Sequence, residues 1–159
     1  MTATVHLLHG LPGCGKTHFA RQLAAERRCV LLSHDEWVVR LFGSQPTTAQ
    51  IESAREPIHA MLWMYTSRIV DAGSDVVLDF GFWTRGERDR AREQVRQAGA
   101  AHRLYTFKCS PQLAWERVKR RNGLDSADSL HIDEQTFWLL AGRIEPLMPD
   151  ETCTSVHGC

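Results

Sequence analysis

A glycine-rich segment near the N-terminus has the residue types and spacing of a phosphate-binding loop. The run Gly10-Leu11-Pro12-Gly13-Cys14-Gly15-Lys16-Thr17 matches the pattern G-x-x-x-x-G-K-[ST]. Glycines let backbone N–H groups surround anionic oxygens, and the start of a following helix adds further donors. We therefore expect these eight residues to bind ATP. Lys16 would reach the β- and γ-phosphates, a binding and catalytic role, and Thr17 would ligate Mg²⁺.

A second magnesium ligand is expected at Asp79. The run Val76-Val77-Leu78-Asp79 is an apolar segment that ends in a carboxylate. Phosphoryl-transfer sites commonly hold Mg²⁺ with the loop hydroxyl and an aspartate at a strand end. The alternative is a strand-terminal aspartate that only caps a turn.

A candidate general base follows another apolar segment, residues 29–33. Asp35 comes just after this segment, and its carboxylate would face the same sheet edge as the phosphate loop. Transfer of a phosphoryl group to an alcohol needs an acceptor for the hydroxyl proton. Asp35 suits this catalytic and substrate-orienting role. Alternatively, it is the N-cap of a helix that begins near Glu36.

Two arginines are candidates for closing over the transferred phosphate. Arg117 and Arg121 are four residues apart in an expected helix, so they share one face. Arginines in a closing lid bind the nucleotide and stabilise negative charge in the transition state. We place this lid around residues 117–131. The alternative is a solvated cationic helix end, which the helix dipole favours.

The residues directly after Asp79 are candidates for an acceptor site. The segment Phe80-Gly81-Phe82-Trp83-Thr84-Arg85 combines aromatic rings with an arginine. Trp83 and Arg85 are predicted to line the acceptor pocket, and Arg40 is a further candidate for contacting the substrate. The alternatives are that the aromatic rings pack under the next helix and that Arg40 is an ordinary surface residue.

Alternating strands and helices must position these side chains. We expect strands at residues 4–9, 29–33, 75–80 and 102–109, and a short fifth strand within 152–156. Helices are expected at residues 17–27, 35–42, 47–72 with a kink or break at Pro57, 87–97, 111–121 and 133–144. This alternation predicts an α/β fold with a parallel sheet covered on both faces, and ligands beyond the carboxyl ends of its strands.

Length and charge limit the function classes. The 159 residues favour one domain spanning 1–159. Lys plus Arg and Asp plus Glu number 19 each, so there is no basic excess for a long nucleic acid. No stretch approaches the ~20 apolar residues that span a bilayer, and neither a secretory leader nor a cysteine framework is recognisable. We expect a cytoplasmic protein whose oligomeric state is left open.

These motifs, in this order, resemble a known family. The phosphate loop, Ser33-x-Asp35, Leu78 to Arg85 and Arg117-x-x-x-Arg121-Asn122 are similar to the small bacterial P-loop kinases of the AAA-family ATPase type. That group resembles chloramphenicol phosphotransferase, zeta toxins and the kinase module of polynucleotide kinase. The resemblance implies a three-layer αβα sandwich of the P-loop NTPase type, with about five strands in the order 2-3-1-4-5. It also implies ATP as donor, Asp35 as base and an arginine-bearing lid.

The function expected from the residues and the resemblance is ATP-dependent phosphorylation of a hydroxyl on a small molecule. Zero net charge, one small domain and aromatic residues near the site favour a compact acceptor. Two alternatives remain open: a 5′-hydroxyl polynucleotide kinase, and a nucleotide-binding regulator without kinase activity.

Overall fold

A computed structural model describes residues 2–124 and 129–157 and shows strands alternating with helices. In chain order the elements are β1 (Thr4–His9), α1 (Lys16–Arg27), β2 (Val30–Ser33), α2 (His34–Phe42), α3 (Thr48–Asp71), β3 (Val76–Gly81), α4 (Arg85–Gln97), β4 (Ala101–Phe107), α5 (Pro111–Asn122), α6 (Glu134–Ala141) and β5 (Thr154–Val156). No helix in these ranges is long and apolar enough to cross a bilayer.

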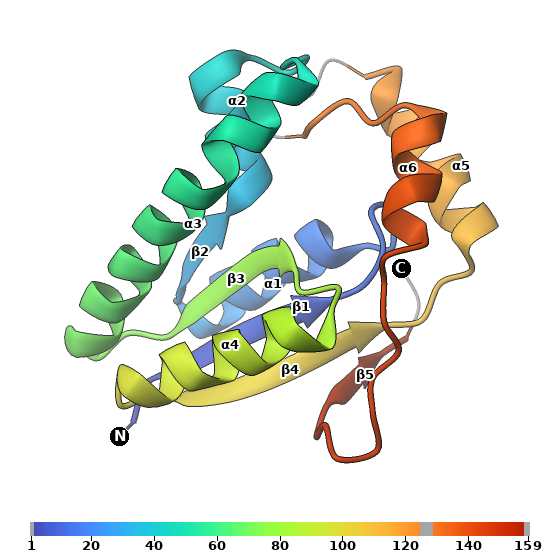
Figure 1. Ribbon diagram of the computed structural model, residues 1–159. Coiled ribbons are helices and arrows are strands. Elements are labelled where there is room, and N and C mark those ends of the chain that lie inside the picture. The colour runs from blue at the N-terminus through green and yellow to red at the C-terminus, as the bar shows by residue number, and fades with distance from the viewer. Residues whose placement is uncertain (1, 125–128, 158–159) are drawn as a thin grey trace.

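The strands form one sheet in the order β2-β3-β1-β4-β5, and every neighbouring pair is parallel (Figure 1). This confirms the predicted topology, including the short fifth strand. Because β1 lies at the centre, the segment that follows it emerges in the middle of the carboxyl edge. Ser33 at the end of β2 is in register with Asp79 on β3. The strand end that precedes Asp35 therefore lies beside the strand end that carries Asp79.

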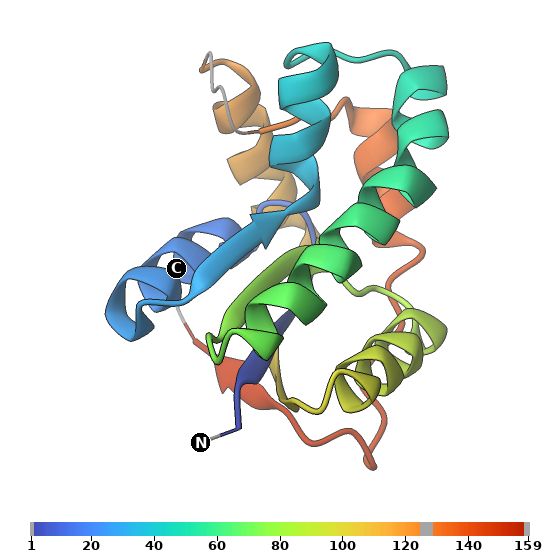
Figure 2. The same cartoon turned by 90° about the vertical axis from the view of Figure 1, so that its left-hand side faces the viewer.

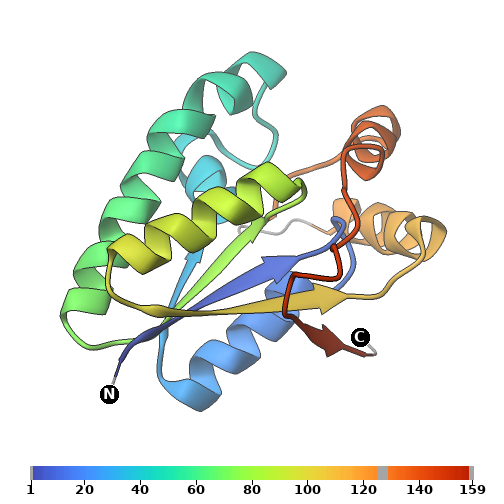
Figure 3. The ribbon, with the colours of Figure 1, turned by 60° about the horizontal axis from the view of Figure 1, so that its bottom comes forward.

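Helices cover both faces of the sheet, as Figures 2 and 3 show for α1 on one side and α3 with α4 on the other. Neighbouring residues in a strand point to opposite faces, so Leu7 joins the core under α3 and α4. Leu8 joins the second core, under α1, α5 and α6. These two cores hold the strand ends, and therefore the loops that follow them, in fixed positions.

Helix α3 differs from the prediction, because it runs through Pro57 without a break. Proline in a helix interior removes a hydrogen bond and crowds the preceding turn. Here Ala54, Ile58 and Leu62 are buried on either side of Pro57, and their packing keeps the helix continuous. Of the two predicted alternatives, a kink or a break at Pro57, the break is therefore wrong. Helix α6 ends at Ala141, earlier than the expected residue 144, and Gly142 is its C-cap.

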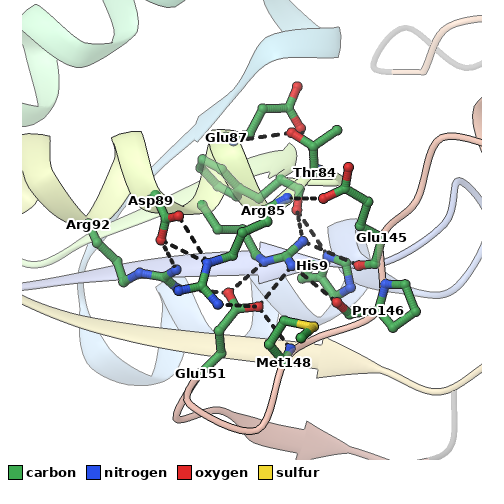
Figure 4. Close-up of polar contacts among 12 residues, drawn as sticks. His9, Thr84, Arg85, Glu87, Asp89, Arg92, Glu145, Pro146, Met148 and Glu151 are labelled. Atoms are coloured by element: carbon green, nitrogen blue, oxygen red, sulfur yellow. Dashed lines mark hydrogen bonds and ion pairs between the residues drawn. The ribbon is translucent and has the colours of Figure 1, made fainter.

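A buried ion pair fastens the segment between α6 and β5 to α4. The Arg88 side chain is fully buried, and its Nε and Nη2 donate to the two Glu151 carboxylate oxygens at 2.7 and 2.9 Å. Arg92 donates to the same carboxylate at 2.9 Å, and the backbone N–H of Met148 donates to it at 3.0 Å (Figure 4). With four hydrogen bonds to its oxygens, the Glu151 carboxylate is strongly favoured in its ionised form.

Glu151 should make the protein sensitive to acid. The hydrogen bonds from Arg88 lower the pKa of this carboxyl from 4.5 to about 2. A lowered pKa in the folded state contributes stability that is complete above pH 4.5 and is lost as the pH falls towards 2. Glu151→Gln should lower the free energy of unfolding at pH 7 by roughly 3 kcal/mol, since it leaves buried Arg88 without its counter-charge. It should also flatten the decline of stability between pH 4.5 and 2, as measured by urea unfolding.

Glu93 provides the matched control. Its pKa is also lowered to about 2, through hydrogen bonds from Arg96, but this pair lies at the surface. Exposed ion pairs contribute little to stability. Glu93→Gln should therefore leave the pH profile nearly unchanged, and equal effects of the two substitutions would contradict the role assigned to burial.

Candidate functional site

The phosphate loop joins the end of β1 to the start of α1 and has the backbone of an anion site. Gly15 is the N-cap of α1, has a φ of +98°, and brings no side-chain hydrogen bond to the helix end. Gly13 also has a positive φ, +80°, which suits a residue without Cβ. The first-turn N–H groups of α1 are consequently left available for an anion, with the favourable end of the helix dipole behind them.

Two close approaches explain why glycine is needed in this loop. A Cβ at Gly10 would lie 2.7 Å from Cys14 Sγ. A Cβ at Gly13 would overlap the Ala114 carbonyl oxygen and lie 2.9 Å from a Val118 methyl group, so the loop is pressed against α5. Cys14 is buried, and this burial raises the pKa of its thiol, so the residue fills space instead of presenting a reactive thiolate.

Lys16 is held by the loop itself. Its ammonium nitrogen donates to the carbonyl oxygens of Gly10 at 2.8 Å and Leu11 at 2.7 Å. The Lys16 side chain therefore folds back onto the loop and satisfies two of its carbonyl oxygens.

The two predicted magnesium ligands meet. The Thr17 hydroxyl in the first turn of α1 donates to Asp79 Oδ2 on β3 at 2.7 Å. Asp79 is buried, and this burial raises the pKa of its carboxyl, while the charge of Lys16 and the Thr17 hydrogen bond oppose the rise. A hydroxyl and a carboxylate beside a phosphate loop fit Mg²⁺, which takes oxygen ligands and is usually held by few protein groups together with phosphates. Within residues 2–124 and 129–157, no three His, Cys, Asp or Glu side chains gather into another metal site.

Asp35 lies in the first turn of α2, half-exposed beside the end of β2. Its Oδ1 is 3.4 Å from Nδ1 of His34. The N-cap of α2 is Ser33, whose hydroxyl accepts from the Glu36 N–H at 3.4 Å. Capping is therefore done by Ser33, and the alternative that Asp35 caps this helix is wrong. The Asp35 carboxylate remains accessible at the sheet edge.

Arg121 lies near both carboxylates. Burial lowers the pKa of its guanidinium, and the attraction of Asp35 and Asp79 opposes that shift. Its Nη2 donates to the Leu130 carbonyl at 3.4 Å, and its buried Nε has no hydrogen-bond acceptor in the described part of the chain. Arg117 lies one turn earlier on α5 and is partly buried. The structure thus brings a cationic helix end to the same place as Thr17, Asp79 and Asp35.

Within and next to the predicted lid, the structure describes hydrogen bonds at Asn122 and at His131. The Asn122 side chain pairs with the backbone of Ile132, donating to its carbonyl at 2.6 Å and accepting from its N–H at 3.2 Å. The His131 N–H donates to the Ser44 carbonyl, in the connection between α2 and α3. Residues 125–128 of the expected lid, 117–131, lie outside the described residues. Asn122 was visible in the sequence only as part of the arginine motif.

The residues predicted to contact the acceptor all make polar contacts within the protein. The Trp83 indole N–H donates to the Gly10 carbonyl at 3.0 Å, so this ring contacts the phosphate loop. The Arg40 guanidinium is well exposed and pairs with Glu36 at 2.8 Å. Arg85 forms an ion pair with Asp89 at 2.9 Å (Figure 4). It forms a second ion pair with Asp150 at 2.8 Å. Glu36 and Asp89 each lie four residues from their arginine on the same helix, a spacing that the sequence shows, whereas the contact with Asp150 depends on how the chain folds.

The contact between Gly13 and α5 can be tested by comparison with Gly99, a glycine of similar φ that lacks such a contact. Gly13 and Gly99 both have positive φ, +80° and +70°, but a Cβ at Gly99 would meet nothing within 4 Å. Gly13→Ala should lower the free energy of unfolding by roughly 1–3 kcal/mol more than Gly99→Ala, since only the first overfills a packed contact. Denaturant unfolding of both variants measures this, and equal losses would contradict the packing of the loop against α5.

Solved structures with a similar fold include a sugar kinase, Kti12 and a chain of an RNA repair complex. A sugar kinase from Janibacter sp. HTCC2649 has a TM-score of 0.67 and 20% identity, covering 98% of this chain and 85% of that chain. Kti12 from Chaetomium thermophilum, in complex with ADP-AlF3, has a TM-score of 0.70 and 21% identity, covering 96% and 88%. A chain of the Pnkp1/Rnl/Hen1 RNA repair complex has a TM-score of 0.73 and 17% identity, covering 89% and 44%. At these identities, the likeness shows the fold alone.

The sequence itself matches one family. Comparison with curated proteins finds no match. A family model described as an AAA domain matches residues 5–147, from β1 to the segment beyond α6. That range includes the phosphate loop, both strand-end carboxylates and the arginine helix. The chain therefore belongs to this AAA domain family, and its phosphate loop lies within the matched range.

Proposed function

We propose that this protein transfers the γ-phosphate of ATP to a hydroxyl group of a small molecule. The observation that carries the proposal is the hydrogen bond between Thr17 and Asp79, beside Lys16 and within reach of the charges of Asp35 and Arg121. Positioning and electrostatic stabilisation supply most of the catalysis in phosphoryl transfer. The proximity of these side chains at one sheet edge supports the proposal.

The phosphate loop would bind the donor. Backbone N–H groups of residues 10–17 would surround phosphate oxygens, and Lys16 would exchange its bonds to loop carbonyls for bonds to the phosphates. Thr17 and Asp79 would hold Mg²⁺, which supplies neutralisation of charge on the phosphates.

Asp35 would act on the acceptor. Its accessible carboxylate would accept the proton of the attacking hydroxyl while the oxygen forms a bond to the γ-phosphorus and the bond to ADP breaks. Arg121 and Arg117 on α5 would stabilise the negative charge of the transferring group. The segment around residues 117–131 would then serve as the lid of a single domain.

The charges around Asp35 favour an uncharged small acceptor over a nucleic acid. Arg40 and Arg85, the two cations expected to contact the acceptor, are already paired with Glu36 and with Asp89 and Asp150. The sequence also has no net positive charge. Binding of a polynucleotide depends on unpaired cations along its backbone path. One similar fold is named a sugar kinase, and another belongs to an RNA repair complex, so both acceptor classes enter the test.

The test measures Mg²⁺-dependent ATP consumption with a panel of acceptors: sugars, nucleosides, amphenicols, aminoglycosides and 5′-hydroxyl oligonucleotides. We expect turnover stimulated by a small uncharged alcohol, with a phosphorylated product. Stimulation by oligonucleotides alone would replace this proposal with the polynucleotide kinase. ATP binding without stimulation by any acceptor would favour the nucleotide-dependent regulator.

Asp35→Asn separates binding from chemistry. The amide cannot take the hydroxyl proton, so transfer should fall by about 10²-fold or more while ATP affinity stays within a factor of two. Lys16→Ala should abolish turnover. Glu36→Gln is the matched control, because its carboxylate is paired with Arg40 on the same helix turn, and it should retain activity. Full transfer activity in Asp35→Asn would refute the assignment of the base.

A further inference from the structure

The carbonyl oxygen of Gly10 is shared by two donors. Lys16 Nζ reaches it at 2.8 Å and the indole Nε1 of Trp83 at 3.0 Å. A carbonyl oxygen has two lone pairs, so the two hydrogen bonds can coexist. Gly10 is buried, so this oxygen must find its partners within the protein.

The backbone around Trp83 leaves room for the indole at this carbonyl. Gly81 has a φ of +90°, and a Cβ there would lie 2.6 Å from the indole Nε1, so any larger residue would displace the ring. The Trp83 carbonyl accepts from Arg88 Nη1 at 3.0 Å and from the Glu145 N–H at 2.9 Å. Arg88 is in turn fixed by Glu151, as described above.

The residue before Trp83 is anchored in the same way. Phe82 has a φ of +43°, and its carbonyl accepts from Arg88 Nη1 at 3.3 Å. The same carbonyl lies 3.0 Å from Nδ1 of His9, the last residue of β1 before the phosphate loop (Figure 4). Burial lowers the pKa of His9. Because a carbonyl oxygen can only accept, Nδ1 of His9 donates this bond. The turn that carries Trp83 is therefore joined to the root of the loop.

We propose that Trp83 is a positioning residue for nucleotide binding, which keeps the Gly10 carbonyl hydrogen-bonded when Lys16 moves to the phosphates. This inference rests on the proposed function, because it assumes that Lys16 exchanges its loop carbonyls for phosphate oxygens. In the empty protein, Gly10 has both donors. In the nucleotide complex, Trp83 is its remaining donor, and without it a buried carbonyl would be left unpaired. Trp83 thus favours the bound state more than the empty one.

Trp83→Phe tests this inference, since it removes the indole N–H and keeps an aromatic ring. The affinity for ATP and Mg²⁺, measured by titration calorimetry, should fall about three- to tenfold, as expected for the loss of one hydrogen bond. Thermal unfolding of the empty protein should change little, because Lys16 still satisfies Gly10. Trp138→Phe, at an exposed tryptophan of α6, is the control and should match the wild type in both measurements.

A second measurement does not need nucleotide. In a Lys16→Met background, Gly10 has lost one donor already, so adding Trp83→Phe should destabilise the empty protein more than it does in the wild-type background. Additive losses, or a Trp83→Phe variant that binds nucleotide as tightly as wild type, would overturn the inference. If the wild type binds no nucleotide, the proposed function is refuted. The stabilities of the single and double variants then still show whether Lys16 and Trp83 share the Gly10 carbonyl.

Discussion

The site depends on one contact between two elements that are far apart in sequence, the hydrogen bond from Thr17 to Asp79. It exists because β1 and β3 are parallel neighbours, so the helix that follows the loop begins beside the end of β3. Burial of Asp79 and the proximity of Lys16 then set the electrostatic character of this edge. Asp35 and Arg121 belong to the same site because the next strand and α5 end at the same edge.

The phosphate loop is supported from two sides, and each support has its own cause. Towards α5, Gly13 permits contact with the Ala114 backbone. Towards α4, the Trp83 indole holds Gly10, and the buried pair of Arg88 and Glu151 holds the turn that carries the indole. The segment before β5, although distant from the phosphate loop in sequence, is consequently part of what keeps the loop in place.

The sequence predicted the loop motif and the meeting of Thr17 with Asp79 at one edge, and the resemblance implied the strand order. The sequence did not predict features that tertiary packing determines, such as the continuity of α3 through Pro57. It also gave no sign that Glu151 would pair with Arg88, since ion pairs between distant segments leave no periodic pattern. Trp83 was expected at the acceptor, and only the structure shows its contact with Gly10.

The most direct test of the account is the effect of Mg²⁺ on ATP binding, measured by titration calorimetry with and without the metal in wild type and Asp79→Asn. If Thr17 and Asp79 form the metal site of a phosphotransferase, Mg²⁺ should strengthen ATP binding in the wild type and lose most of that effect in Asp79→Asn. An affinity for ATP that is the same with and without Mg²⁺, or a full magnesium effect in Asp79→Asn, would contradict it.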